Sequence, residues 1–419
     1  MARNISQSNP MVSVIIPAFN AERFLRATLD SVFAQSLKDF EVILIDDGSV
    51  DRTREVATSY SEVRYHYQPN QGPATARNNG LKLSHGDYLA FLDADDVWHK
   101  DMLSSCIHVF EQHPELGAVH TNWLPIDNHG EQIRQASGWQ PWTGNIFSRL
   151  LIDIPFNSSC ILWKHECYNA IGGFDVTPEI NDDWLNWLRI AHLGYEFGCV
   201  ETPLTYVRVH ENSLTHRQNA RIIQWRIRAL NDISRESVIS DDVKKRAYGR
   251  IYWLMALNAL LEDDCVSAGQ AFQDAVQNDP SIQYLFETYY AIAFCGNGFL
   301  GSEKIIGFRF DRAEQNLSCM LQRNIFSSAT PYRITAAFAL MSLARIAYGM
   351  SSQDAGMTKL GRQYLWRSIA TNPTLSWVVQ NAFWVLRILL GMRLVSVFAS
   401  FHSGFGLKAD LFSDDSVPQ

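Results

Sequence analysis

The sequence predicts an α/β domain with a mostly parallel sheet over residues 11–216, followed by an all-α domain of helical hairpins over residues 217–412. Apolar runs and helical stripes alternate along the first half at intervals of about 20 to 30 residues, which is typical of β-α-β units. From residue 217 onward glycine becomes rarer and only helical stripes recur. Residues 1–10 and 413–419 are predicted to be disordered tails.

Four runs in the first half are predicted to be buried strands, because most of their residues are apolar or β-branched. These runs are 12–16, 40–45, 63–67 and 89–92. The apolar spacing and capping residues between them predict helices. These helices span about residues 24–33, 51–60 and 74–83. A further strand is predicted over residues 157–163, after an irregular region from 123 to 142.

Composition narrows the classes of function. The chain has 419 residues, 47% of them apolar, which is enough for two domains with cores of their own. The net charge of −8 argues against a broad nucleic-acid-binding surface. The seven cysteines are scattered without a CxxC pair, which predicts reduced thiols in a cytoplasmic protein. No apolar segment follows the polar N-terminus, so no signal peptide is predicted.

Carboxylates follow two of the predicted strands. Asp46 and Asp47 end the second, and Asp93, Asp95 and Asp96 follow the fourth. In an open parallel sheet both groups lie at the same ligand-binding crevice. Like charges so close together are costly unless a cation lies among them, and a divalent cation would also hold a phosphate. A polar turn with an Asp helix cap is the structural alternative. The chain lacks both the glycine-rich dinucleotide motif and the P-loop.

Several motifs, taken together and in this order, resemble those of the family 2 glycosyltransferases. They are VSVIIPAFN at 12–20, DDGSVDRT at 46–53, GPATARNNG at 72–80, GDYLAFLDADD at 86–96 and GGFD at 172–175. The resemblance covers roughly residues 11–215, half of the chain. It implies the GT-A fold and a reaction that uses a nucleotide-diphospho-sugar and a divalent cation, Mn²⁺ or Mg²⁺.

Carried over residue by residue, the resemblance implies a set of donor-binding positions. They are Pro17, Phe19, Asn20, Asp47, Arg77, Asp93 and Ala94. Pro17, Phe19 and Asp47 would line the pocket for the base and ribose, with Asp47 accepting a hydrogen bond from the base. Arg77 would approach the diphosphate. Core packing of Phe19 and a solvated helical position for Arg77 are the structural alternatives.

The resemblance also implies the metal ligands. Asp93 and Asp95 form the Asp-x-Asp motif, in which Asp95 would bind the metal directly and Asp93 would contact the ribose or a metal-bound water. His210, near the end of the matching region, is a candidate further ligand, with a structural role as the alternative. A cation together with Arg77 would stabilise the charge that develops on a departing nucleoside diphosphate.

The acceptor side is predicted from the helix that begins at about residue 181. Asp182 and Asp183 stand at its N-terminus, where the helix dipole favours anions, and N-capping is the structural alternative. The family places its general base in an acidic pair before a Trp, so the resemblance implies Asp183 as the base, with Asp182 and Trp184 on the acceptor side. The usual pair is Glu-Asp, which leaves open which carboxylate acts.

The resemblance implies an inverting enzyme of polysaccharide biosynthesis that uses a glycan or lipid-linked acceptor, with a uridine-type donor weakly favoured. The processive signature Gln-x-x-Arg-Trp is absent, which favours the addition of one sugar per event. A nucleotidyl- or phospho-sugar transferase is the enzymatic alternative. The non-enzymatic alternative is a sugar-nucleotide-binding scaffold that acts through its helical half.

The helical half resembles degenerate tetratricopeptide-like pairs, whose function is to dock a protein partner or a second protomer. Residues 377–401 are apolar and aromatic but include Arg387 and Arg393, which makes a membrane-spanning helix expensive. An interfacial helix and a capping helix of the helical domain both fit this segment. The first would give peripheral contact with the inner face of the membrane.

Overall fold

The computed structural model describes most of the first half of the chain and parts of the second. The described residues are 9–133, 139–154, 156–176, 182–210, 219–236, 239–284, 299–300, 305–306, 312–313, 315–316 and 355–371. The chain divides into two compact units, Met1–Val243 and Lys244–Gln419. The predicted boundary between the α/β domain and the helical domain, at residue 216, stays a prediction. Helix α8 (Asn219–Glu236) follows this boundary and lies within the first unit.

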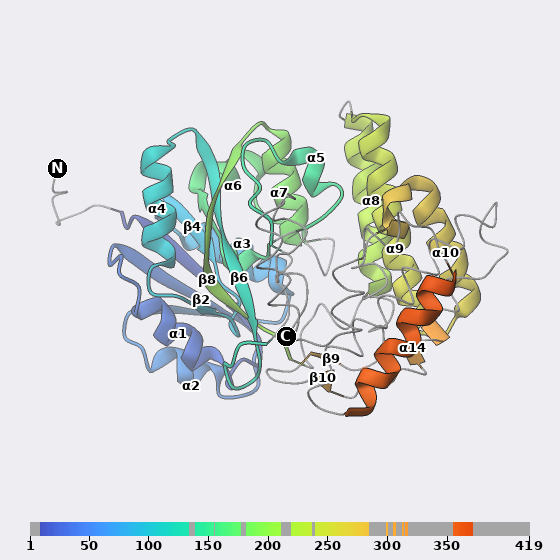
Figure 1. Ribbon diagram of the computed structural model, residues 1–419. Coiled ribbons are helices and arrows are strands. Elements are labelled where there is room, and N and C mark those ends of the chain that lie inside the picture. Colours follow the sequence, from blue (N-terminus) through green and yellow to red (C-terminus); the bar gives the residue numbers. More distant parts are fainter. Residues whose placement is uncertain are drawn as a thin grey trace, which may run out of the picture. The chain divides into compact units, whose positions relative to one another are not determined.

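The first unit is built on a mixed sheet with the strand order β3-β2-β1-β4-β7-β6-β8-β5 (Figure 1). Its strands are β1 Val12–Ala18, β2 Phe40–Asp47, β3 Val63–Gln68, β4 Tyr88–Phe91, β5 Val97–Trp98, β6 Leu116–Ile126, β7 Ile161–Lys164 and β8 Glu196–Arg208. Strand β1 pairs in parallel with β2 and β4, and β2 pairs in parallel with β3. Strand β7 is antiparallel to both β4 and β6. The predicted α/β class with a mostly parallel sheet is confirmed.

Helices cover both faces of the sheet, and this explains the apolar runs in the sequence (Figure 1). Helices α1 (Leu25–Phe33), α2 (Thr53–Thr58) and α4 (Met102–Gln112) share one core with Val12, Val14 and Ile16 of β1. On the other face, Ile15 packs against Gly80 of α3 (Pro73–Leu83), and Phe91 of β4 contacts Tyr168 of α6 (His165–Ile171).

The predicted elements differ from the observed ones in three places. The predicted helix over 51–60 is the shorter α2. The strand predicted over 157–163 begins as a 3₁₀ turn, η1 (Ser158–Cys160), whose two serines donate their hydroxyls to carboxylates, and only Ile161 onward is strand β7. The region predicted to be irregular from residue 123 opens with the last residues of β6. The acceptor-side helix is α7 (Asp182–His192), followed by β8.

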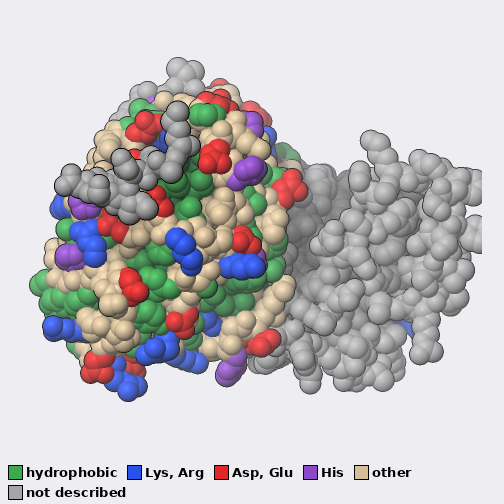
Figure 2. Space-filling view, turned by 90° about the vertical axis from the view of Figure 1, so that its left-hand side faces the viewer, with side chains coloured by type: hydrophobic (Ala, Val, Ile, Leu, Met, Phe, Trp, Pro, Cys, Tyr) green, Lys and Arg blue, Asp and Glu red, His purple; other side chains and the backbone are tan. Residues whose placement is uncertain are grey.

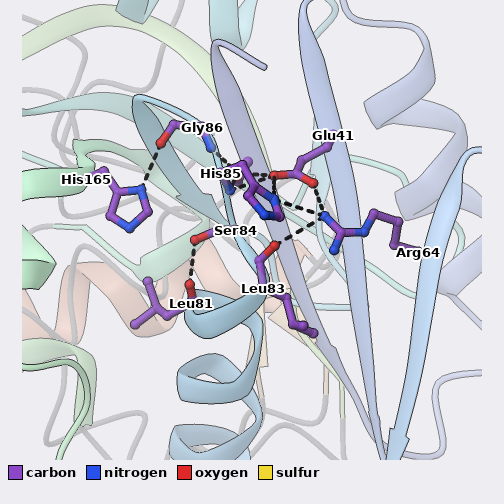
Figure 3. Close-up of polar contacts among 9 residues, drawn as sticks. Glu41, Arg64, Leu81, Leu83, Ser84, His85, Gly86 and His165 are labelled. Atoms are coloured by element: carbon purple, nitrogen blue, oxygen red, sulfur yellow. Dashed lines mark hydrogen bonds and ion pairs between the residues drawn. The ribbon is translucent and has the colours of Figure 1, made fainter. Parts of the chain in front are cut away.

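A polar cluster at the amino ends of the strands fastens the loop before β4 to the sheet (Figure 3). Glu41 of β2 accepts hydrogen bonds from Ser13 Oγ at 2.7 Å and from the His85 N–H at 2.8 Å, and it pairs with Arg64 of β3. Burial alone would raise the pKa of Glu41, but the bonds from Ser13, His85 and Arg64 outweigh it and hold the pKa below its ordinary value. This cluster lies at the opposite edge of the sheet from the predicted crevice.

The described part of the second unit contains a helical hairpin. Helices α9 (Asp241–Leu261) and α10 (Cys265–Asn278) pack through Trp253 and Phe272, whose ring centroids are 6.0 Å apart. Helix α14 (Ala355–Thr371) buries Tyr364 and Leu365. The expectation of helices alone is wrong for β9 (Phe299–Leu300) and β10 (Ile305–Ile306), which pair antiparallel.

Several predictions fall on residues outside the described ranges. These are the tails at 1–8 and 413–419 and the apolar segment 377–401. Within the described residues, no helix is both long and apolar enough to cross a membrane. The expectation of reduced thiols holds for Cys106, Cys160, Cys167 and Cys199, which are free. It is wrong for Cys265, which is disulfide-bonded.

Candidate active site

The carboxyl ends of β1, β2 and β4 carry most of the residues predicted to bind a donor. Phe19 follows β1 directly, Asp47 ends β2, and Asp93 stands two residues after β4. The loop after β2 turns at Gly48, which has a φ of +83°, and a Cβ atom there would lie 2.7 Å from the Asn70 nitrogen. Glycine is therefore needed at this position to let the loop approach residue 70.

Asp47 is buried and fixes the loop that leads into α3. Its Oδ1 accepts hydrogen bonds from Gln68 Nε2 at 2.7 Å and from the Gln71 N–H at 2.8 Å. Its Oδ2 accepts from the Gly72 N–H at 2.9 Å. A carboxylate offers about four lone-pair sites, so these bonds leave room for one further donor.

Phe19 is 51% exposed, which excludes core packing as its role. Pro17, two residues earlier, is partly buried. Asn20 has a φ of 48°, and its Oδ1 accepts from the Val50 N–H at 3.0 Å, so it joins the loops after β1 and β2. Tyr67 near the end of β3 is 61% exposed, and the sequence analysis did not single it out. Two aromatic rings are thus exposed near the ends of β1 and β3.

Arg77 of α3 lies beside the Asp-x-Asp motif. Its Nη2 donates to Asp93 Oδ1 at 2.8 Å, and its guanidinium lies 5.7 Å from the ring centroid of Phe174. Arg77 is 6% exposed, so the structural alternative of a solvated helical arginine is excluded. The pair places one buried positive charge at the edge of the acidic cluster.

Asp95 and His210 meet although they are far apart in sequence. His210 Nε2 lies 2.8 Å from Asp95 Oδ2, and Ala94 stands between Asp95 and Asp93 in the same loop. His210 follows β8, whose Arg208 donates from its backbone N–H to Asp96 and from Nε to the Asp95 carbonyl oxygen. These two bonds hold the end of β8 against the Asp-x-Asp loop.

The residues present suit a divalent cation. Asp95 and His210 offer a carboxylate oxygen and an imidazole nitrogen at one point. Within the described residues, no group of three or more His, Cys, Asp or Glu side chains is arranged to hold a metal ion. The remaining ligands would be phosphate oxygens of a bound donor and water, as is usual for Mg²⁺.

Asp96 is a buried carboxyl that the sequence analysis left without a role. Ser159 Oγ donates to its Oδ2 at 2.6 Å, and the Arg208 N–H donates to its Oδ1 at 2.9 Å. Burial, followed by the neighbouring charges of Asp95 and Asp93, raises the pKa of Asp96 well above its ordinary value. Asp96 therefore joins three segments of the chain behind the predicted metal ligands.

Asp183 lies at the start of α7 and accepts a hydrogen bond from Ser158 Oγ at 3.2 Å. Ser158 precedes Ser159, so Asp183 and Asp96 contact adjacent residues of η1. Asp182 is the first residue of α7. Trp184 is 3% exposed and donates from its indole to the Leu150 carbonyl oxygen at 2.8 Å, so its ring is part of the core around α7.

The loop that carries Trp139 and Trp142 is fixed by His120 of β6. Trp139 Nε1 donates to His120 Nδ1 at 2.9 Å, and His120 Nε2 lies 2.8 Å from the Trp142 carbonyl oxygen. Burial lowers the pKa of His120 to about 4, and the contact with the Trp142 carbonyl offsets only part of this effect. The neutral imidazole therefore accepts from one tryptophan and donates to the other.

Acid is expected to weaken the contacts of His120 with Trp139 and Trp142 and to lower the stability of the fold. The pKa of His120 is lower in the folded protein than in the unfolded chain, where it is near 6.5. The contribution of His120 to the free energy of unfolding is therefore complete above pH 6.5 and is lost as the pH falls toward 4. The free energy of unfolding should drop by about 2 kcal/mol more in wild type than in His120→Phe between about pH 7.5 and about pH 5. Urea denaturation of both proteins at the two pH values measures this difference, and equal drops would contradict the assignment.

One face of the first unit is shown in Figure 2. Among the described residues of that face, Lys and Arg side chains alternate with Asp and Glu and with apolar groups, and no single type gathers into a broad patch.

The chain is similar to known glycosyltransferases. Residues 13–165 match the model of the family "Glycosyl transferase family 2". An uncharacterized glycosyltransferase of Rickettsia typhi is 35% identical over 221 residues, which cover 50% of this chain and 67% of that protein. The chondroitin synthase of Escherichia coli is 26% identical over 246 residues, or 57% of this chain and 34% of that protein.

The similarity covers only part of several relatives. An uncharacterized glycosyltransferase of Rickettsia felis is 31% identical over 202 residues, which are 47% of this chain and 33% of that protein. The chain thus spans about a third of the length of such relatives. The residues matched by the family model, 13–165, contain strands β2 to β7, the Asp-x-Asp loop and η1. The chain belongs to the family 2 glycosyltransferases.

Proposed function

We propose that this enzyme transfers a sugar from a nucleotide-diphospho-sugar to a hydroxyl group of a glycan or lipid-linked acceptor, with inversion at the anomeric carbon and with the help of a divalent cation. The observation that carries the proposal is the contact of Asp95 with His210 at 2.8 Å, next to the pair of Arg77 and Asp93. A carboxylate, an imidazole and a buried arginine together suit a metal-bound diphosphate.

The chain's own residues then have distinct roles. Phe19 and Asp47 bind the base and ribose, and Arg77 orients the diphosphate through its position beside Asp93. When bound at Asp95 and His210, the cation would supply positive charge to the diphosphate. Asp183 takes the proton of the acceptor hydroxyl while that oxygen bonds to the anomeric carbon from the face opposite the leaving group. The bond from the anomeric carbon to the phosphate oxygen breaks, and the nucleoside diphosphate leaves with its electrons.

The finer parts of the proposal rest on the sequence and on the family resemblance that it carries. They are a uridine-type donor, a role in polysaccharide biosynthesis, transfer of one sugar per event, and action in the cytoplasm. We also propose that the helical half docks a partner protein or the membrane surface.

The test is to incubate the purified chain with a panel of nucleotide sugars and Mn²⁺ and to identify the released product. We expect a nucleoside diphosphate from one donor, and loss of that release on addition of EDTA. Release of inorganic diphosphate would instead indicate a nucleotidyltransferase. No turnover of any donor, with or without candidate glycans, would favour the scaffold alternative.

A further inference from the structure

Two adjacent serines in η1 direct their side chains to the two halves of the proposed active site. Ser158 is 5% exposed and Ser159 is fully buried. The hydroxyl of each serine donates a hydrogen bond to a different carboxylate, Ser158 to Asp183 and Ser159 to Asp96. The two carboxylates belong to segments that lie about 90 residues apart in sequence, and η1 is the point at which both are held.

On the donor side, Ser159 fixes the Asp-x-Asp loop at several points. Its Oγ donates to Asp96 Oδ2 at 2.6 Å and accepts from the Asp93 N–H at 3.1 Å. Its carbonyl oxygen accepts from Trp98 Nε1 at 2.7 Å. A hydroxyl group has one proton to donate and two lone pairs, so both Oγ contacts can form together. The loop is therefore held to η1 on both sides of Asp95.

On the acceptor side, the Asp183 carboxylate has a hydrogen bond at each oxygen. Ser158 Oγ donates to Oδ2 at 3.2 Å, and the Trp184 N–H donates to Oδ1 at 2.7 Å. A carboxylate oxygen has two lone pairs and can accept more than one hydrogen bond. The two bonds define the plane of the carboxylate, and with it the direction from which an acceptor hydroxyl can approach.

We infer that Ser158 is a positioning residue for the base, and that its peptide link to Ser159 sets the separation between the base and the Asp-x-Asp loop. The inference rests on the proposed function. A general base must lie within hydrogen-bond distance of the proton that it takes, and a small misplacement lowers the rate strongly. A single turn that holds both the base and the loop would fix the acceptor oxygen relative to the anomeric carbon.

The experiment compares Ser158→Ala with Ser13→Ala. Ser13 is the matched control because it is also a buried serine that donates to a carboxylate, Glu41, but at the opposite edge of the sheet. We expect Ser158→Ala to lower kcat for sugar transfer about tenfold to a hundredfold, with the KM for the donor unchanged. Ser13→Ala should lower the melting temperature about as much as Ser158→Ala does, but it should keep the wild-type kcat.

Two further variants separate positioning from a general loss of structure. Ser158→Thr keeps the hydroxyl and should recover most of the lost kcat. In an Asp183→Asn background, Ser158→Ala should add no further loss, because the group that it positions is already absent. Equal losses of kcat in Ser158→Ala and Ser13→Ala would overturn the inference while leaving the proposed function intact. A wild-type chain that transfers no sugar would remove the proposed function, and the inference would fall with it.

Discussion

Replacing Asp183 with Asn is expected to lower the rate of sugar transfer by about a hundredfold to ten thousandfold, because a positioned general base contributes a factor of this size. The amide cannot take the acceptor proton at neutral pH. It is close to the carboxylate in shape, so it still receives the hydrogen bond from Ser158 through its oxygen. The fold and the binding of the donor should therefore persist, as measured by melting temperature and by the KM for the donor.

Asp182→Asn is the paired measurement, because the sequence leaves open which member of the acidic pair is the base. We expect a clearly smaller loss of kcat in Asp182→Asn than in Asp183→Asn. The reverse order would move the role of base to Asp182. Equal and full activity in both variants would remove the general base from this helix altogether.

The sequence predicted the parts of the site that depend on strand ends. The apolar run before Asp93 and the run before Asp47 indicated buried strands, and the carboxyl ends of those strands lie at one edge of the sheet. His210 was predicted only through the family resemblance. Its contact with Asp95 depends on where the end of β8 lies, and local sequence does not specify this.

Sequence reasoning missed residues whose role depends on contacts distant in sequence. Ser159 and Asp96 are 63 positions apart, and a pair of serines carries no pattern that distinguishes a hydrogen-bonded turn from an ordinary strand. The predicted acceptor-side ring of Trp184 is buried because its indole reaches the Leu150 carbonyl. The one available signal for η1 was polar: the predicted strand 157–163 begins with Asn157 and two serines before its apolar residues.

Replacing Asp95 with Asn is expected to have opposite effects on activity and on stability. Transfer should fall by about a thousandfold, because the cation loses its carboxylate ligand and the departing diphosphate loses the charge that stabilises it. Without metal, however, the variant should melt at a higher temperature than wild type. The charge on Asp95 is one of the causes that oppose ionisation of the buried Asp96, so its removal relieves repulsion in the folded protein.

Melting curves with and without Mn²⁺ separate these two effects. In wild type, Mn²⁺ together with the donor should raise the melting temperature through preferential binding to the folded state, and in Asp95→Asn this increase should vanish. Asp101→Asn is the control, because this partly exposed carboxylate directly precedes α4 and lies near His99, so its replacement should change neither quantity. A metal response that survives in Asp95→Asn would show that the cation binds elsewhere. A lower melting temperature without metal would show instead that Asp95 stabilises the fold, in which case its contact with His210 outweighs the repulsion among the three neighbouring aspartates.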